Sequence, residues 1–436
     1  MRTRRALGLF LAFSLLFCML PTPARANTPT QAETLLAAMS PAEKVGQLFL
    51  ITFSGSSVSE GSLLRELITT HHIGGFVLRA DHDNFSGTDT LASTYDLIAD
   101  MQTAAWDKSQ PSPNTSLGGE LPAYVPLFIG IEQNGNSASQ ILSGLSDQPN
   151  QMTLGATWSP SLAQQAGQVL GSELSALGFN LFLGPTLDVA ETTSMETAAY
   201  SGADLYGADP YWVGEIGRAY IAGLHAGSLN RLSVIARHFP GLGSTDRPPD
   251  LEVATVRKSL EQLKQIELAP FFAVTSAEDP NAQADGVMVS HIRFQGFQGN
   301  IRATTRPISF DATALSQLLA VEPLASWRFA GGLMVSDSLG SKAVRSFFDP
   351  TGQSFDANTI AGSAFIAGND MLYLNNFASS GETKPYETIL QTLDYFSGKY
   401  EEDPAFAQRV DQAVLRILNV KMQLYGEFTL ETIIPD

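Results

Sequence analysis

Short, continuous apolar runs recur along the chain, with enough residues between successive runs for a helix. Eight runs rich in β-branched and aromatic residues occupy 45–53, 73–79, 125–133, 180–189, 233–239, 286–292, 332–338 and 370–374. Their apolar residues are consecutive rather than alternating with polar ones, as is typical of parallel strands buried on both faces. The pattern therefore predicts eight parallel β-strands.

Amphipathic helices are predicted between these strands. Leucines and an isoleucine within 63–68 share one helical face, and valine, isoleucine and leucine do so within the closing helix, 410–418. The segment 159–178 begins with a Ser-Pro pair, typical of a helix N-terminus, and ends at a glycine. Eight strands alternating with helices predict an α/β fold, a (β/α)₈ TIM-type barrel, with an open doubly wound sheet as the structural alternative.

The N-terminus has the pattern of a secretory signal peptide. Three arginines within the first five residues precede an apolar run, 6–20, and an Ala-x-Ala site ends at Ala26. A membrane anchor is the alternative, but the run is shorter than the ~20 residues of a spanning helix, and prolines follow it. We expect cleavage after Ala26, export to the periplasm or the extracellular space, and no stable membrane anchor.

The remaining residues, 27–436, are predicted to form one large domain. Their length would allow two, but no Pro/Ser-rich or charged linker divides them. The longest polar break, 106–126, lies between two strand-like runs and is interpreted as a loop.

Charge and cysteine content narrow the possible functions. The formal net charge is −18, and it becomes −22 when the four arginines of the signal peptide are removed. Such an acidic protein is a poor partner for nucleic acid or for anionic membranes. The single cysteine, Cys18, lies within the signal peptide, which excludes disulfides and thiolate metal sites in the mature chain. Nothing in the sequence implies a cofactor or indicates an oligomeric state.

Polar residues collect where the predicted strands end. Because the loops after barrel strands meet at one face, where such enzymes carry their chemistry, these residues predict a site. They are Glu132, Gln133, Asp188, Arg237, His238, His291 and Asp337.

Asp337 is the strongest catalytic candidate among them. A carboxylate at a strand end can attack the anomeric carbon of a sugar, as in retaining glycosidases. Alternatively, Asp337 is an N-cap of a helix that begins near Gly340. The two histidines, His238 and His291, lack the spacing of metal ligands, and no glycine-rich phosphate motif follows the first strand.

Several segments together resemble a known enzyme family. They are "MSPAEKVGQLFL", "IGGFVL", "LGPTLDV", "YGADPYWVGEIGRAYIAGL", "RHFPGLG", "MVSHI", "GLMVSDSLGSKAV" and "AGNDMLYL". In this order they resemble the N-terminal barrel domain of glycoside hydrolase family 3, and most nearly its single-domain bacterial β-N-acetylhexosaminidases. The resemblance covers nearly the whole mature chain. It is more specific for fold than for activity.

The resemblance implies roles for individual residues. Asp337 matches the nucleophile of the family's Ser-Asp-x-Leu motif. Arg237 and His238 match a Lys-His pair that binds sugar hydroxyls, with arginine in place of lysine. Glu132 stands where the family has an aspartate that binds sugar hydroxyls. Together with His291 at a strand end, these are the candidate substrate-binding residues.

Two departures from the family pattern bear on catalysis. Asp204 stands where the family has a substrate-contacting arginine. The Asp-Ser-His triplet that carries the family's acid/base falls on Pro248, Pro249 and Asp250, and proline offers no proton. Asp250 would serve instead if burial or Asp337 raised its pKa. Two further acids on this loop, Asp246 and Glu252, are alternatives, as is the interpretation that all three are solvated loop acids.

The sequence therefore supports two functional hypotheses. The first is a retaining β-glycosidase acting on β-linked N-acetylglucosamine or a similar terminal sugar of cell-wall or polysaccharide fragments. Asp337 would be its nucleophile and Asp250 its proton donor, with carboxyl groups about 5 to 5.5 Å apart. The second is a non-catalytic carbohydrate-binding protein on the same barrel, prompted by the lost dyad.

Overall fold

The computed structural model describes residues 30–86, 89–111, 121–133, 142–191, 202–379, 382 and 386–435. The predicted signal peptide and Cys18 lie outside this part of the chain, as do residues 112–120 of the predicted loop. The beginning of that loop, up to Ser109, belongs to a helix.

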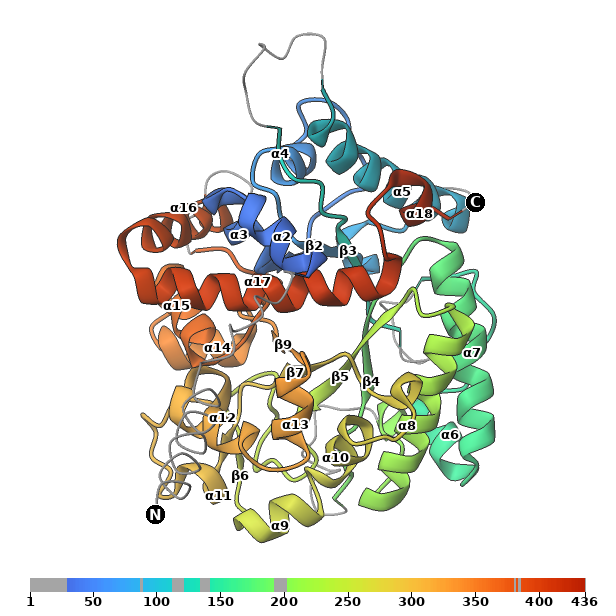
Figure 1. The fold of residues 1–436 in the computed structure, drawn as a ribbon. Coiled ribbons are helices and arrows are strands. Elements are labelled where there is room, and N and C mark those ends of the chain that lie inside the picture. Colours follow the sequence, from blue (N-terminus) through green and yellow to red (C-terminus); the bar gives the residue numbers. More distant parts are fainter. Residues whose placement is uncertain are drawn as a thin grey trace, which may run out of the picture.

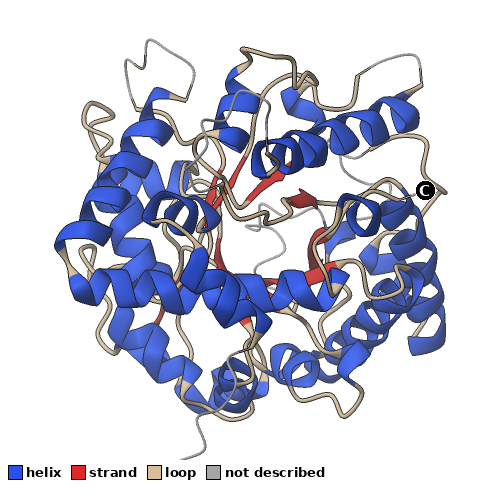
Figure 2. Cartoon of the chain, turned by 45° about the horizontal axis from the view of Figure 1, so that its top comes forward, coloured by secondary structure: helices blue, strands red, loops and turns tan. Residues whose placement is uncertain are grey.

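Eight parallel strands form the centre of the molecule, surrounded by helices (Figures 1 and 2). Neighbours follow the order β10-β1-β2-β3-β4-β5-β7-β9, and a parallel bridge from Val335 to Met371 brings the two edge strands together. The predicted barrel is thus confirmed, and the open sheet is excluded. The strands are β1 Phe49–Ile51, β2 Gly75–Val77, β3 Phe128–Ile131, β4 Leu181–Thr186, β5 Ser233–Phe239, β7 Gly286–Val289, β9 Leu333–Ser336 and β10 Leu372–Leu374.

Each predicted run contains one of these strands, and almost all strand residues are buried. The first run is the exception in its boundaries, because residues 45–47 belong to a helix, α3. Ser40 caps that helix by accepting a hydrogen bond from the backbone N–H of Glu43, and Pro41 begins it. The apolar residues of the helix end and of β1 therefore merge into one run in the sequence.

The helices around the barrel include the predicted ones. Ser159 caps α7 and Gly178 follows its end with a φ of 91°, as predicted. The helices that connect or follow the strands include α4 Leu63–Thr69, α5 Thr90–Ser109, α7 Pro160–Ala176, α8 Pro210–Gly227, α10 Ala269–Thr275, α12 Ala312–Leu319, α15 Ala357–Ala367, α16 Glu387–Glu402 and α17 Pro404–Tyr425. None of the described helices is long and apolar enough to cross a membrane.

Further small elements complete the fold. A second, two-stranded parallel sheet pairs β6 with β8 beside the barrel. The remaining elements are α2 Gln31–Ala38, α3 Pro41–Gln47, α6 Gln151–Ala156, α9 Leu260–Gln265, α11 Gln295–Gln298, α13 Leu324–Phe329, α14 Lys342–Phe348, α18 Leu430–Ile433, β6 Thr255–Val256, β8 Arg293–Phe294, η1 Ala80–His82, η3 Gly202–Asp204, η4 Pro280–Ala282 and η5 Ile308–Phe310.

One buried carboxylate ties two outer helices to the barrel. Asp370, which is fully buried just before β10, accepts hydrogen bonds from Arg328 of α13 and from Arg409 and Arg416 of α17. It also accepts one from the Met334 N–H of β9 at 3.1 Å. Burial alone would raise the pKa of Asp370, but the three guanidinium groups outweigh it and lower that pKa.

We expect Asp370→Ala to lower the free energy of unfolding by about 3–5 kcal/mol, because it removes a fully buried carboxylate and leaves three partly buried arginines without their partner. Urea unfolding at neutral pH measures this. Glu261→Ala, which breaks the exposed pair of Glu261 with Lys264, serves as the control and should cost about 0–1 kcal/mol. Since the pKa of Asp370 is lower in the folded state, its contribution is present above the ordinary aspartate range and is lost at more acidic pH. An Asp370→Ala protein as stable as the native one would contradict this role.

Candidate active site

The carboxyl ends of the strands enclose a pocket of about 630 Å³. Because parallel strands point the same way, residues far apart in the sequence meet there. From β2 to β10 in chain order, the pocket is lined among others by Arg79, Glu132, Thr186, Asp204, Arg237, His238, Pro249, Asp250, His291, Asp337, Lys342 and Tyr373. Five of the seven strand-end residues predicted to form a site thus share one pocket.

Asp337 follows β9 directly and is partly exposed in this pocket. Its N–H donates to the Val289 carbonyl of β7 at 3.0 Å, and its Oδ1 accepts from the Ser338 N–H at 2.7 Å. The helix after it, α14, is capped by Ser341, whose hydroxyl accepts from the Val344 N–H. The alternative role of Asp337 as the helix N-cap is therefore wrong.

Glu132 lies between two arginines. Its Oε2 is 2.8 Å from Nη1 of Arg237, and its Oε1 is 3.6 Å from Nη1 of Arg79. Arg79 is itself held by a bidentate pair with Asp81, at 2.8 and 2.9 Å. Fixed carboxylate and guanidinium groups of this kind can accept from and donate to the hydroxyls of a sugar.

His238 is paired with a carboxylate below the pocket. Its Nδ1 is 2.8 Å from Oδ2 of Asp188, which is fully buried and also accepts from the Leu242 N–H at 2.7 Å. Burial would lower the pKa of His238, but Asp188, and to a smaller extent Asp337, outweigh it and raise that pKa. Asp188 therefore supports His238 from behind and does not line the pocket.

His291 is held at both ring nitrogens. Nδ1 is 2.8 Å from the Ser309 hydroxyl, Nε2 is 3.1 Å from the Ser338 carbonyl, and the ring stacks on Phe310. Burial lowers the pKa of His291, which favours the neutral ring. This arrangement favours a positioning role, since His291 fixes the backbone beside Asp337.

The three acids of the loop after β5 lie in different surroundings. Asp246 accepts from the Thr255 N–H at 2.8 Å, and Glu252 pairs with Arg247 at 3.1 Å, while neither lines the pocket. Asp250 alone among them lines it. Although Asp250 is solvent-accessible, partial burial of its carboxyl raises its pKa; the charge of His238 opposes that rise and the charge of Asp337 adds to it.

Comparison with known proteins identifies the fold's family. A profile described as "Glycosyl hydrolase family 3 N terminal domain" matches residues 41–420. The chain belongs to this family. The resemblance found in the sequence is thereby confirmed.

Family 3 relatives of the chain are distant. It is 26% identical over 392 residues to a "Beta-N-acetylglucosaminidase/beta-glucosidase" of Cellulomonas fimi, covering 90% of this chain and 59% of the relative. A solved family 3 β-N-acetylglucosaminidase from Paenibacillus sp. is 26% identical with a TM-score of 0.71, covering 88% of this chain and 63% of that one.

A third relative shares the fold over almost its whole length. The β-N-acetylhexosaminidase of Beutenbergia cavernae has a TM-score of 0.69 at 22% identity, and the match covers 98% of that chain and 88% of this one. By contrast, the chain spans 59% of the Cellulomonas fimi relative and 55% of a "Beta-hexosaminidase A" of Pseudoalteromonas piscicida.

Within this family 3 domain, one strand-end expectation is wrong, and the expected departure at position 204 lies in the pocket. Gln133, predicted at the strand ends, is buried, and its Oε1 accepts from the Leu142 N–H instead of facing the pocket. Asp204, which stands where the resemblance implies an arginine, does line the pocket, as does Pro249. The pocket of this member therefore presents a carboxylate where the family is expected to present a cation.

Among the pocket residues that the strand-end pattern did not select are Arg79, Tyr373 and Lys342. Arg79 ends the second apolar run, so the rule that selected the other strand ends could have found it. Tyr373 lies inside the last run and counts there as apolar, and its buried side chain has a pKa raised by desolvation. Lys342 begins α14, and nothing in its spacing indicated that this turn borders the pocket.

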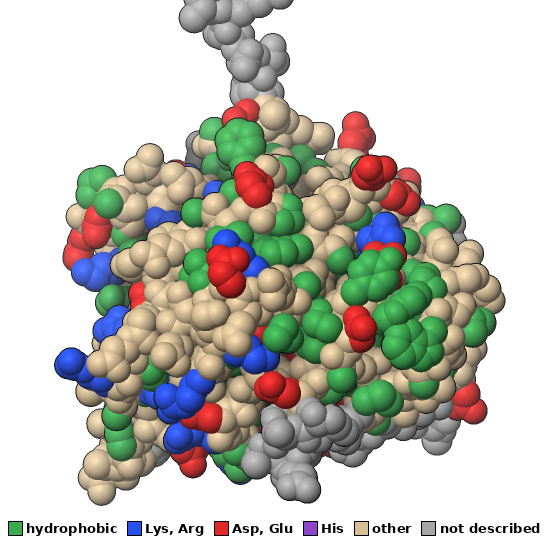
Figure 3. Space-filling model, turned by 90° about the horizontal axis from the view of Figure 1, so that it is seen from below, with side chains coloured by type: hydrophobic (Ala, Val, Ile, Leu, Met, Phe, Trp, Pro, Cys, Tyr) green, Lys and Arg blue, Asp and Glu red, His purple; other side chains and the backbone are tan. Residues whose placement is uncertain are grey.

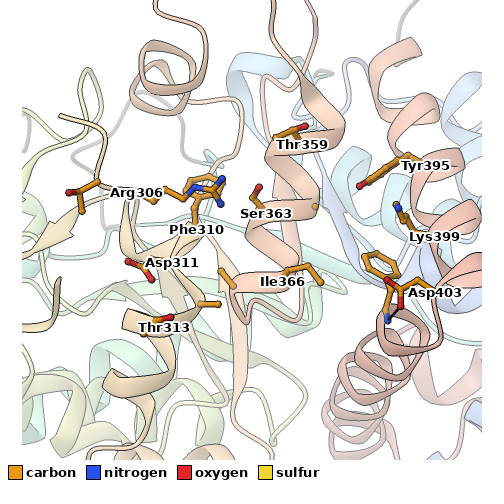
Figure 4. Close-up of a pocket in the computed structure, with 15 residues that line it drawn as sticks. Arg306, Phe310, Asp311, Thr313, Thr359, Ser363, Ile366, Tyr395, Lys399 and Asp403 are labelled. Atoms are coloured by element: carbon orange, nitrogen blue, oxygen red, sulfur yellow. Dashed lines mark hydrogen bonds between the residues drawn. The ribbon is translucent and has the colours of Figure 1, made fainter. Parts of the chain in front are cut away.

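Other features of the described part of the family 3 domain are weaker candidates for an active site. No cluster of three or more potential metal ligands occurs among the described residues. A second hollow, of about 680 Å³, lies on the outer helices, where α15 separates Phe310 and Asp311 from Tyr395 and Lys399 (Figure 4). Its lining comes from helices and turns rather than strand ends, and the barrel pocket is therefore the candidate active site.

Proposed function

We propose that the chain is a retaining β-glycosidase, which removes terminal β-linked N-acetylglucosamine or a similar sugar from cell-wall or polysaccharide fragments. The observation that carries this proposal is that Asp337 and Asp250 line one pocket at the strand ends, together with charged groups that suit sugar hydroxyls. The names of the relatives, β-N-acetylglucosaminidase and β-hexosaminidase, support the choice of sugar.

In the first step, a carboxylate oxygen of Asp337 attacks the anomeric carbon while the bond to the departing oxygen breaks. Asp250 donates its proton to that oxygen, so the leaving group departs as a neutral alcohol. A raised pKa of Asp250 supports this role, because a proton donor is most effective when its pKa lies near the working pH.

In the second step, the glycosyl ester on Asp337 is hydrolysed. Asp250, now a carboxylate, takes a proton from water, whose oxygen attacks the anomeric carbon and releases Asp337. Two displacements at one carbon return the original configuration, which requires the two carboxyl groups to lie about 5 to 5.5 Å apart.

The remaining pocket residues are proposed to bind and orient the sugar. Glu132, Arg79 and Arg237 form a fixed row of charged groups. The ring of His238 is held by Asp188, whose negative charge favours the protonated form of the ring. Hydrogen bonds to such charged groups are stronger than neutral ones, so they suit the positioning of a polar substrate.

A non-catalytic carbohydrate-binding protein is the second candidate. Proline at positions 248 and 249 removes two members of the expected acid/base triplet, and Asp204 replaces an expected cation. If, in addition, Asp337 forms no glycosyl ester, the same pocket would bind sugar without cleaving it.

Substrates that need no proton donor distinguish the glycosidase from the carbohydrate-binding protein. The native protein is expected to hydrolyse dinitrophenyl β-N-acetylglucosaminide or the matching β-glucoside, because this leaving group departs with little protonation. Release of dinitrophenolate is followed by absorbance. If neither sugar is hydrolysed while both bind in calorimetry, the carbohydrate-binding function holds instead.

Export is part of the proposal. Cleavage after Ala26 would release a protein that meets its substrate in the periplasm or outside the cell. N-terminal sequencing of the protein from a culture medium or periplasmic fraction would test this, with Asn27 as the expected first residue.

A further inference from the structure

Another pocket, lined by arginines, lies beside the candidate active site. We call it the arginine pocket; it has a volume of about 390 Å³. It is lined by four arginines, by Glu252, by Phe347 and by small or apolar residues. The arginines are Arg247, Arg257, Arg293 and Arg302.

Positive charge is concentrated here against the overall charge of the protein. The whole chain carries a formal charge of −18, yet the arginine pocket brings together four guanidinium groups. Among the described residues, two carboxylates form ion pairs with them: Asp246 contacts Arg247 and Arg257, and Glu252 contacts Arg247. Figure 3 shows basic side chains gathered on the left of the lower face, the side on which β6 and α11 lie in Figure 1.

Arg293 is built into the pocket rather than lying on its surface. It is 9% exposed, and it donates to the backbone carbonyls of Thr305 at 2.6 Å and Ala303 at 2.8 Å. Its guanidinium lies over the Phe347 ring, 5.4 Å from the centroid. Guanidinium has five N–H donors, so these fixed contacts leave donors that can point at a ligand.

Arg302 is available to a ligand. Its side chain is exposed, and its guanidinium has no hydrogen-bond or ion-pair partner within the described part of the chain. Burial lowers the pKa of Arg293, and the nearby charge of Arg247 lowers it further although Asp246 opposes this, which indicates that cations lie close together here. A bound anion would relieve that repulsion.

The arginine pocket adjoins the active-site pocket along one short stretch of chain. Asp250 and Leu251 line the active-site pocket, whereas the next residue, Glu252, lines the arginine pocket. On the neighbouring loop, Ile292 lines the former and Arg293 the latter. The pairing of β6 with β8, Thr255 opposite Arg293, fixes the two loops together.

We propose that the arginine pocket binds the carboxylate of an acidic sugar unit on the leaving-group side of the substrate. An oligosaccharide whose terminal sugar lies over Asp337 would pass across Leu251, which is half exposed. Its next sugar unit would then lie at the arginines. Guanidinium groups match the planar, two-oxygen geometry of a carboxylate. This inference rests on the proposed function, and it narrows the substrates to acidic oligosaccharides.

The test uses two disaccharides that differ in a carboxylate. Chitobiose is neutral, and chitobionic acid carries a carboxylate on the unit next to the cleaved bond. We expect the native protein to prefer the acid in kcat/KM, and the preference to weaken with added salt, since salt screens charges. In Arg302→Gln, the ratio of kcat/KM for acid over neutral should fall about tenfold, the effect of losing one charge-assisted hydrogen bond.

Arg231→Gln is the matched control. Arg231 is exposed and precedes β5, so the same charge is removed at the opposite end of the strands, and the ratio should stay at its native value. Calorimetric binding of the two disaccharides to Asp337→Asn protein gives a readout that needs no turnover. Failure of dinitrophenyl glycoside hydrolysis would overturn the proposed function alone. Equal binding and turnover of the two disaccharides, or an unchanged ratio in Arg302→Gln, would overturn the arginine pocket as a carboxylate site.

Discussion

Replacement of Asp337 by asparagine is expected to lower kcat on dinitrophenyl glycosides by on the order of 10⁴-fold or more, because a carboxamide cannot form the glycosyl ester. The two side chains have nearly the same shape, and the Ser338 N–H can still donate to the remaining carbonyl oxygen. Sugar binding should therefore persist, and KM should change little. Initial rates with the purified native and variant proteins measure this.

Asp204→Asn provides the control for the loss of a negative charge. Asp204 lines the same pocket but has no proposed part in bond making. Its replacement should act through KM more than through kcat. If Asp337→Asn kept more than about a tenth of the native kcat, Asp337 would not be the nucleophile.

Replacement of Asp250 by asparagine is the second large effect. On substrates with poor leaving groups, such as chitobiose, kcat/KM should fall about 10²- to 10⁴-fold, the usual contribution of a positioned proton donor. On dinitrophenyl glycosides kcat/KM should stay close to native, because the first step needs little protonation. The kcat on dinitrophenyl glycosides should nevertheless fall, because the second step still needs a base. Added azide should restore this kcat, because azide replaces water as the nucleophile.

The pH profile gives an independent readout of Asp250. Activity on poor leaving groups requires the protonated acid, so kcat/KM must fall as pH rises through its pKa. Burial and Asp337 raise the pKa of Asp250, so this falling limb should lie above the ordinary aspartate range and disappear in Asp250→Asn. A loss of the same size in Glu252→Gln, with Asp250→Asn unaffected, would transfer the proton donor to Glu252.

The barrel could be predicted from the sequence because its strands are buried on both faces. Continuous apolar runs of that length are typical of such strands, and the ends of α7 are marked by Ser159 and Gly178. The run at 45–53 shows where the pattern stops being informative. A helix end and a strand that are both buried give the same run, so the boundary at Gln47 is visible only in three dimensions.

The site was predictable to the extent that it follows from strand ends. Glu132, Arg237 and Asp337 meet because their strands are parallel and belong to one closed barrel. The direction of a side chain beyond a strand end is not encoded in the same way. Gln133 turns inward and Asp188 lies beneath His238, although both stand at the ends of their apolar runs, as Glu132 and Asp337 do.

The acids of the loop after β5 could not be separated from the sequence. Asp246 faces Thr255 and Arg257, whereas Asp250, four residues later, faces the pocket, because the turn at 248–251 reverses the chain between them. Choosing among acids four residues apart requires the path of the loop. The position of Asp250 in the pocket is what makes it the preferred proton donor.

A covalent bond between Asp337 and the sugar is central to the proposed mechanism, and trapping that bond tests it most directly. The native protein would be incubated with the dinitrophenyl N-acetylglucosaminide and glucoside that carry fluorine on C5, the carbon bonded to the ring oxygen on the side opposite the anomeric carbon. Fluorine there slows both steps, while the good leaving group speeds the first, so the intermediate accumulates. Mass spectrometry should then show one added sugar, located on the peptide that contains Asp337. The absence of any adduct, or an adduct on Asp250 instead, would contradict this mechanism.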